Sequence, residues 1–187
     1  MPNFEHVTIS TQRLLLRPLR TSDAQTLFDI HSSEEVMRYW SGLPWASIDV
    51  AHERIQRDLR TMPLGEFLNL GIVRIEDDVL LGTCCLFHFD EQCRRAEIGY
   101  ALGVHAWGHG YMQEALEALI QYGFTTLNLN RIEADIDPLN TASAKALLRQ
   151  GFQKEGFLRE RWIVNGVKAD TEIYGLLLDD WRKNHPQ

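Results

Sequence analysis

A strand, a glycine-rich turn and a helix follow one another in the middle of the chain. Residues 96–104, AEIGYALGV, form a short and largely apolar run that is typical of a strand. Apolar residues then return every three or four positions over residues 112–126, which predicts an amphipathic helix. A second strand is predicted over residues 130–136, so we expect a parallel, right-handed βαβ unit. The inward stripe of the helix consists of Met112, Ala115, Leu116, Leu119 and Gly123.

The rest of the chain alternates between strand and helix patterns. Apolar runs that end at turn residues predict strands over residues 13–17, 67–75, 79–89, 152–158, 160–164 and 168–177. Capping residues followed by helical spacing predict helices over residues 21–31, 34–39, 47–62 and 141–150, with a short helical tail. Asn165-Gly166 predicts a type I′ hairpin turn, and Gly156 a break in its strand. No linker or repeat divides the pattern, so we expect one domain over residues 1–187.

The turn between the central strand and helix carries the first sign of chemistry. Gly108 and Gly110 lie two positions apart just before the predicted helix. A glycine turn at a helix start leaves several backbone N–H groups free, and these form a site for a phosphate or pyrophosphate. Any side chain in the turn would hold an anion away from the amides. The alternative is a tight turn with no ligand, because many α/β proteins connect a strand to a helix through glycine.

Composition excludes several classes of protein. Apolar residues are 44% and charged residues 24% of the 187 residues, the values of an ordinary globular chain. The net charge of −7 argues against a nucleic-acid-binding surface. We find no apolar run of about 18 residues and no secretory signal, so we expect no membrane association. Cys84, Cys85 and Cys93 are odd in number and lack metal-ligand spacing, which favours a reduced, cytoplasmic protein without a metal.

The same residues resemble a known family. AEIGYALGVHAWGHGYMQEA, followed by RIEADIDPLNTASAKALLRQGF, is similar to the GNAT superfamily of acyl-CoA-dependent N-acetyltransferases. The opening RLLLRPLRTSDAQTLFDI and the ending EIYGLLLDDW are similar to the branch that includes the RimJ and RimL ribosomal-protein N-terminal acetyltransferases. This resemblance implies the α/β (α+β) fold of that family. We therefore expect a mixed, mostly antiparallel central sheet of six to seven strands, with a splayed parallel pair and helices on both faces.

The resemblance implies acetyl-CoA as the cosubstrate and places it at the glycine turn. The family's loop is Gln/Arg-x-x-Gly-x-Gly/Ala, and this chain departs from it at the first position, which is His105. Main-chain amides of the loop hold the diphosphate in the family. Backbone groups of the preceding strand, here Leu102 and Val104, hydrogen-bond the pantetheine arm as an added strand does. The residues implied in cosubstrate binding are Leu102, Val104, His105, Gly108, His109, Gly110, Tyr111, Met112, Asn140 and Ser143.

The second motif resembles Asn-x-x-Ser followed by a helix and Gly-Phe. Here it consists of Asn140, Ser143, Gly151 and Phe152. In the family the asparagine contacts the pantetheine arm and the serine hydroxyl reaches the sulfur of CoA. Ser143 would then be the general acid that protonates the departing thiolate. Taken alone, Asn140 is equally well explained as a helix N-cap.

A general base is needed to deprotonate the amine, and the first candidate is Glu97. Glu97 shares its strand face with Gly99 and Ala101, which leave room for a substrate. Its alternative role is an ion pair with Arg94, Arg95 or a neighbouring strand. The second candidate is Glu160, for which a solvated strand face is the favoured interpretation. Asp170 and Tyr174 on the last strand are further candidates for the acceptor pocket.

Histidines and tryptophans complete the candidate residues. His88, His105 and His109 have no partner at a spacing that suggests a charge relay, so we interpret them as turn and strand residues. The three tryptophans that we expect in the acceptor pocket are Trp40, Trp45 and Trp162.

The sequence therefore predicts transfer of an acetyl group from acetyl-CoA to a primary amine by direct attack in a ternary complex. The acceptor is either a protein N-terminal α-amine or a small amine. The backbone N–H near Leu102 would polarise the thioester carbonyl. The alternative is a non-catalytic acyl-CoA sensor or a partner-binding module, which the departure at His105 favours and the Asn140–Ser143 pair opposes. A monomer and a homodimer both fit the sequence.

Overall fold

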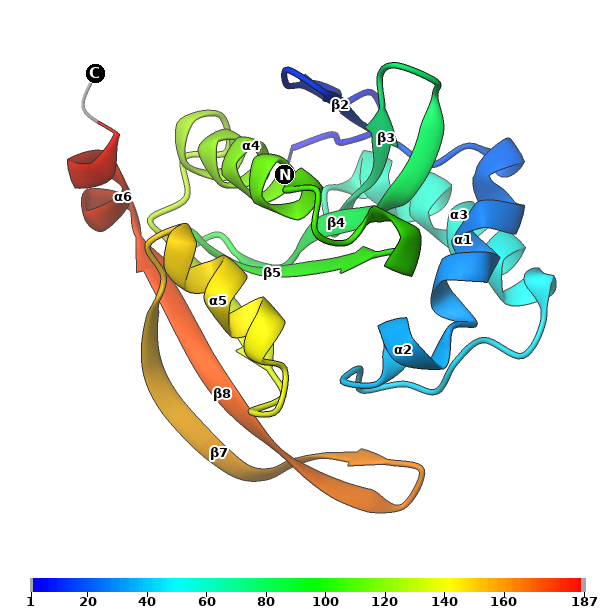
Figure 1. The fold of residues 1–187 in the computed structure, drawn as a ribbon. Coiled ribbons are helices and arrows are strands. Elements are labelled where there is room, and N and C mark those ends of the chain that lie inside the picture. Colours follow the sequence, from blue (N-terminus) through cyan, green and yellow to red (C-terminus); the bar gives the residue numbers. More distant parts are fainter. Residues whose placement is uncertain (1, 186–187) are drawn as a thin grey trace.

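The computed structural model describes residues 2–185 and has the expected α/β architecture around a central sheet (Figure 1). The strand order is β1-β2-β3-β4-β5-β6-β8-β7, and every pair is antiparallel except β5 with β6. The strands are β1 (Ile9–Ser10), β2 (Leu14–Arg17), β3 (Leu68–Arg74), β4 (Val79–Asp90), β5 (Arg95–Leu102), β6 (Arg131–Ile136), β7 (Gln153–Val164) and β8 (Val167–Leu177).

The described sheet has eight strands, whereas six to seven were expected. The strand missed is β1, which has only two residues and is too short to produce a hydrophobic pattern. The two predicted runs, residues 152–158 and 160–164, form the single strand β7, which continues through Gly156 and whose register against β8 shifts after Lys154 and again after Leu158. Bulges of this kind interrupt the alternation of side chains without ending a strand.

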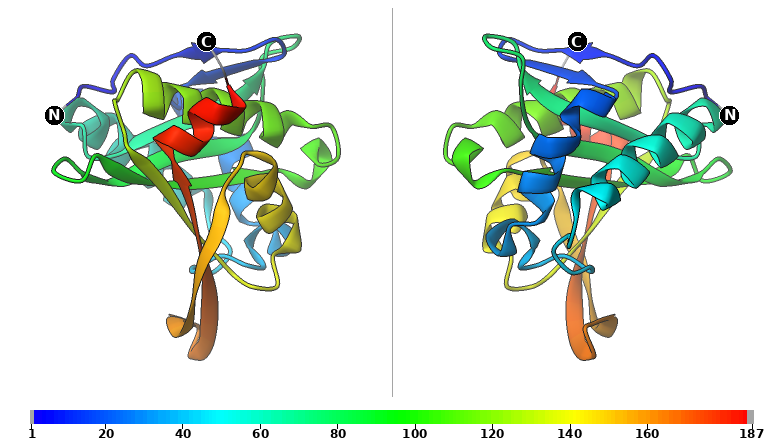
Figure 2. Two further views of the ribbon diagram at one scale, coloured as in Figure 1. Left: turned by 90° about the vertical axis from the view of Figure 1, so that its left-hand side faces the viewer. Right: turned by 90° about the vertical axis from the view of Figure 1, so that its right-hand side faces the viewer.

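Helices cover both faces of the sheet (Figure 2). One face carries α1 (Ala24–His31) and α3 (Ile48–Thr61), and the other carries α4 (Tyr111–Thr125), as the two separate buried clusters around them show. The predicted stripe of α4 is buried, apart from the half-exposed Met112. The remaining helical segments are the short α2 (Glu34–Met37), α5 (Thr141–Arg149), α6 (Leu178–Asn184) and the 3₁₀ turns η1 (Thr21–Asp23), η2 (Met62–Leu64) and η3 (Val104–Ala106).

The predicted βαβ unit is present, and its two strands separate after a short contact. Residues Arg95–Glu97 of β5 pair with Arg131–Glu133 of β6, and no pairing continues beyond Glu97. From there β5 stays with β4 as far as Leu102, while β6 follows β8 as far as Ile136. A gap therefore opens between the two halves of the sheet, next to the glycine turn that follows β5.

The β7–β8 hairpin extends beyond the body of the protein (Figure 1). Asn165 and Gly166 at its tip have φ of +48° and +78°, as a type I′ turn requires. Several apolar side chains of this hairpin are exposed, among them Ile163 at 70% and Val167 at 68%. Its base borders the gap between β5 and β6, because β8 pairs with β6.

Candidate functional site

The glycine turn forms an open anion site at the start of α4. Gly108 and Gly110 both have φ of +78°, a left-handed conformation that favours glycine, and Gly110 is the N-cap of the helix. Within residues 2–185, the main-chain amides from Gly108 to Gln113 have no hydrogen-bond acceptor. A Cβ on Gly108 would meet no atom within 4 Å. Free amides, the positive end of the helix dipole and open space together fit a diphosphate.

Arg13 holds this turn in place, a contact that the sequence pattern did not reveal. Its Nη1 donates to the carbonyl of His109 at 3.0 Å, and its Nε lies 2.7 Å from Glu114 Oε2 in the first turn of α4. Its guanidinium also lies over the ring of Tyr111, at 4.7 Å from the centroid. The Glu114 carboxylate accepts a further hydrogen bond from Thr11. The segment before β2 therefore fixes the N-terminus of the helix on the sheet.

The end of β5 presents main-chain groups to the gap. Gly103 N donates to Leu81 O at 2.9 Å, on the β4 side of the strand. Because successive residues of a strand point their N–H and C=O groups to opposite sides, those of Leu102 and Tyr100 face the gap. The Leu102 carbonyl accepts a hydrogen bond from Trp107 Nε1 at 2.8 Å, so its amide is the group left for a ligand.

Two residues of the predicted loop lie differently from the expectation. The strand ends at Leu102, and Val104 begins the 3₁₀ turn η3, in which its carbonyl accepts from Trp107 N at 3.1 Å. The Val104 carbonyl is thus engaged in a turn and does not continue strand β5. The imidazole of His105 folds back over Gly103, where an added Cβ would meet His105 Cε1 at 2.7 Å. The unusual side chain at this position thus packs against the Gly103 backbone.

The second motif forms a hydroxyl pair on the other side of the gap. Asn140 Oδ1 accepts from Ser143 N at 3.1 Å, so Asn140 is the N-cap of α5, as predicted. Ser143 Oγ lies 2.6 Å from the hydroxyl of Tyr100 on β5. Burial raises the pKa of Tyr100 to about 12, so its hydroxyl stays protonated at neutral pH. Sequence reasoning missed Tyr100, because an aromatic residue on a central strand is usually part of the core.

Glu97 is paired with a histidine across the β4–β5 ladder. Its Oε1 lies 3.1 Å from His88 Nδ1, while Arg95 pairs with Glu133 instead. His88 lies on strand β4, in agreement with its interpretation as a strand residue, but the contact with Glu97 was not expected from the sequence spacing. The register of β4 shifts between Phe87 and Asp90, and the left-handed φ of +50° at His88 turns its ring toward Glu97. Such an irregularity is not visible in the sequence.

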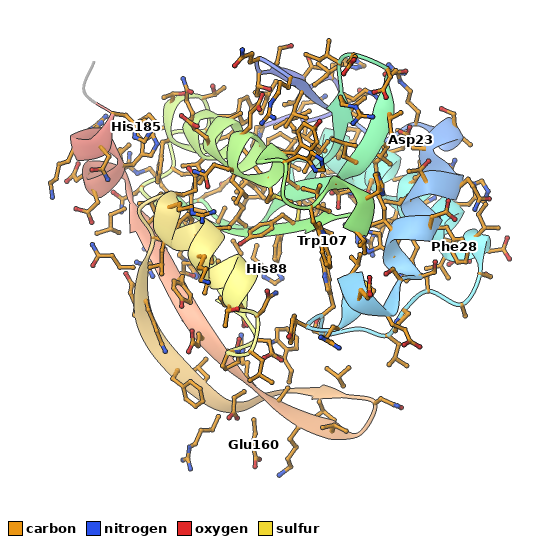
Figure 3. All side chains as sticks on the ribbon, in the orientation of Figure 1. Asp23, Phe28, His88, Trp107, Glu160 and His185 are labelled. Atoms are coloured by element: carbon orange, nitrogen blue, oxygen red, sulfur yellow. The ribbon has the colours of Figure 1, made fainter. Side chains whose placement is uncertain are left out.

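Glu160 is not brought together with the other candidates. It lies on the projecting hairpin and points away from the body of the protein (Figure 3). Its Oε2 accepts from Lys168 Nζ at 2.7 Å, and its main-chain N donates to Asp170 at 2.7 Å. Its side chain is exposed, in agreement with the solvated strand face that the sequence favoured. It does not border the cavity that contains Glu97 and Ser143.

One cavity of about 570 Å³ joins these groups. It runs from the gap, where Asn140 and Ser143 lie, past Glu97 to the helices on the opposite face of the sheet. Trp40, Trp45 and Trp162, the three tryptophans expected in the acceptor pocket, all border this cavity, and Asp170 does as well. Tyr174 does not, because it is 4% exposed in the core and donates to Glu172. The volume suits a small substrate beside an acyl group.

No group of three or more His, Cys, Asp or Glu side chains within residues 2–185 is arranged to hold a metal ion. No helix in that range is both long enough and apolar enough to cross a bilayer.

Comparison with known proteins identifies the family. Residues 13–153 match the acetyltransferase (GNAT) domain. The chain is 41% identical to the N-acetyltransferase p20 of Bacillus licheniformis, over 91% of this chain and 96% of the relative. It is 27% identical to the [ribosomal protein uS5]-alanine N-acetyltransferase of Escherichia coli, over 96% of this chain and 95% of that enzyme. Each match covers the glycine turn, the gap and the Asn140–Ser143 motif.

A solved structure of another acetyltransferase shares the fold. The crystal structure of spermidine N-acetyltransferase from Vibrio cholerae, in complex with CoA and spermine, superposes with a TM-score of 0.81. It is 22% identical and covers 91% of this chain and 99% of that structure's chain, a likeness that concerns the fold. The chain therefore belongs to the GNAT acetyltransferase family. It is an acyltransferase, an N-acetyltransferase that depends on acetyl-CoA, with relatives among the ribosomal-protein acetyltransferases.

Proposed function

We propose that this enzyme acetylates a primary amine in the cavity between Glu97 and Ser143, by direct attack on the thioester. The acceptor is a protein N-terminal α-amine or a small amine. The observation that carries the proposal is that a carboxylate and a hydroxyl pair border the same cavity beside the gap between β5 and β6. A reaction that removes a proton from nitrogen and delivers one to sulfur needs a base and an acid in that arrangement.

The chain's own groups fit the cosubstrate. The free amides between Gly108 and Gln113 are proposed to hold the diphosphate, and the gap between β5 and β6 to take the pantetheine arm. When bound, acetyl-CoA supplies the activated acetyl group. The amide of Leu102 faces the gap and is proposed to donate to the thioester carbonyl oxygen, where negative charge develops. Asn140 borders the same space and is proposed to contact the arm.

The base is proposed to be Glu97. An alkylammonium has a pKa near 10 and a peptide α-ammonium near 8, so most of the acceptor is charged at neutral pH. Glu97 takes one proton, directly or through a water molecule, and releases the neutral amine for attack. Its side chain is 27% exposed, so it is accessible from the cavity. His88 is proposed to position the carboxylate from the neighbouring strand and to pass its proton to solvent.

The acid is proposed to be Ser143. The new C–N bond forms at the carbonyl carbon as the C–S bond breaks, and Ser143 Oγ gives its proton to the leaving sulfur. The nitrogen loses a second proton as the amide forms, which restores the serine hydroxyl through solvent or the Tyr100 hydroxyl. One turnover thus converts ammonium and thioester into amide and thiol, with one proton released. The hydrogen bond to Tyr100 stabilises the charge on Ser143 during this step.

A thiol-release assay tests the proposal. The enzyme is mixed with acetyl-CoA and a panel of amines, including peptides that begin with Ser, Ala or Met, and free CoA thiol is followed over time. We expect release above the background hydrolysis rate with at least one amine, and a matching acetylated product by mass spectrometry. Measured acetyl-CoA binding without release for any amine would instead favour the non-catalytic binding module.

A further inference from the structure

The cavity contains an arginine that the proposed chemistry does not use. Arg54 of α3 borders the cavity and lies over the ring of Phe67, 5.2 Å from its centroid. Its Nε donates to both carboxylate oxygens of Asp58, at 3.1 and 3.2 Å. Within residues 2–185, its two terminal nitrogens have no hydrogen-bond partner. Asp58 therefore fixes the guanidinium by one edge and leaves its other donors to the cavity.

The charge around Arg54 is not fully compensated. The Asp58 carboxylate is 3% exposed and also accepts from Asn69 Nδ2 at 2.6 Å. A second guanidinium, that of Arg57, lies 3.9 Å from the same carboxylate on the solvent side of the helix. Two positive charges thus share one negative charge, and one positive charge remains. A guanidinium held in this way is pre-organised to bind a carboxylate through two parallel hydrogen bonds.

Apart from Asp58 and Arg57, two ionisable side chains near Arg54 are neutral. Burial, and secondarily the charge of Arg54, lower the pKa of His31 to about 4, so this imidazole is uncharged at neutral pH. It stacks on Trp45 at a centroid distance of 4.4 Å. Burial raises the pKa of the Cys85 thiol to about 12, so no thiolate competes for the guanidinium. This end of the cavity is a cation set among aromatic and neutral surfaces.

Two phenylalanine rings connect Glu97 on the sheet with Arg54 on α3. Glu97 on β5 is directly opposite Phe87 on β4, and Phe87 packs on Phe67, at a centroid distance of 5.7 Å. Arg54 lies over Phe67. Glu97 and Arg54 therefore border the same cavity with only the Phe87 and Phe67 rings between them. A short molecule that carries an amine at one end and a carboxylate at the other can therefore join the two groups, with one hydrogen bond of about 3 Å at each end.

We propose that the acceptor is a free amino acid, whose carboxylate binds Arg54 while its amine lies beside Glu97. This inference rests on the proposed function and names its substrate class. The side chain of the amino acid would lie between the cavity's aromatic walls, which favours an apolar one. Longer peptides are disfavoured, because their carboxylate cannot lie on Arg54 when their N-terminal amine is at Glu97.

Matched acceptors test the inference. The value of kcat/KM is measured for phenylalanine, phenylalaninamide and phenethylamine, and for the corresponding leucine series, with short peptides alongside. We expect the acids to exceed their amides by about tenfold to a hundredfold, the effect of a hydrogen-bonded charge. The carboxylate raises the pKa of the amine, so intrinsic amine reactivity would favour the amide. An acid-to-amide ratio of one or less in the wild type would overturn the inference.

Variants of Arg54 test whether this residue causes the preference for acids over amides. Arg54→Met should reduce the acid-to-amide ratio to near one, Arg54→Lys should retain part of it, and the control Arg60→Met, exposed on the same helix, should leave it unchanged. The ratio is measured within each variant, so a loss of folded protein does not affect it, and Arg54→Lys serves if Arg54→Met does not fold. An unchanged ratio in the Arg54 variants would contradict the assignment. Absence of thiol release with every amine would overturn the proposed function itself.

Discussion

The hydroxyl of Tyr100 on β5 lies 2.6 Å from Ser143 Oγ on α5. We predict that Ser143→Ala lowers kcat by about a hundredfold, because the leaving thiolate loses its proton donor. The dissociation constant for acetyl-CoA should change little, since the loop amides provide most of the binding. Steady-state kinetics and calorimetric titration separate the two quantities. Thr141→Ala, an exposed change on the same helix, is the control, and an equal kcat in Ser143→Ala and wild type would remove Ser143 from the mechanism.

Glu97→Gln should lower kcat/KM at neutral pH by about a hundredfold, because the amide cannot accept a proton from the acceptor. The deficit should shrink as pH rises toward the pKa of the amine, where solvent has already removed that proton. A pH profile of both proteins measures this convergence. His88→Ala should show a smaller deficit, and Glu160→Gln none, because Glu160 lies outside the cavity. A deficit in Glu97→Gln that stays constant with pH would show that Glu97 has a structural role only.

Acid stability provides a test of the buried His31. Its folded pKa is about 4, below the ordinary value of 6.5, so the unfolded chain binds a proton that the folded chain rejects. The free energy of unfolding should therefore fall as pH decreases through 6.5 toward 4, by about 3 kcal/mol from this group. Denaturant titrations of the wild type and His31→Gln give the difference. Parallel pH dependence in the two proteins would show that His31 does not contribute.

Gly110→Val should weaken binding of acetyl-CoA. The φ of +78° at this residue strains any β-branched side chain, and a Cβ there would meet Arg13 Nη2 at 3.5 Å. Calorimetric titration should give a dissociation constant at least about tenfold above that of the wild type, the equivalent of one charge-assisted hydrogen bond. Gly42→Val is the matched control, because no atom lies within 4 Å of its added Cβ and its φ is not left-handed. Equal affinity in Gly110→Val and wild type would argue against the diphosphate site.

Much of the architecture was predictable because periodicity directly reflects burial. The α4 stripe, the parallel βαβ unit and the Asn165-Gly166 turn follow from local patterns that tertiary contacts did not overrule. The two-residue β1 was not predictable, because it has no pattern of its own and exists only through its pairing with β2. The continuity of strand β7 was also not predicted, because the sequence around its bulges, at Gly156, suggested a break.

The candidate site was predictable where main-chain geometry defines it. Gly108 and Gly110 adopt a left-handed conformation that favours glycine, so their residue type alone indicated it. Asn140 and Ser143 were recognisable from the spacing of their motif. His88, Tyr100 and Arg54 gave no signal, because each acquires its role from a residue on another element. His88 reaches Glu97 through a bulge, and Arg54 is held at the cavity by Asp58, which itself accepts a hydrogen bond from Asn69.

The central claim concerns where the diphosphate and the thiol of coenzyme A bind. A crystal structure of the complex with coenzyme A measures this directly. We predict phosphate oxygens within about 3 Å of main-chain amides between residues 108 and 113, and the sulfur beside Ser143 Oγ in the gap between β5 and β6. Phosphates bound away from that turn, or a pantetheine arm outside the gap, would contradict the account.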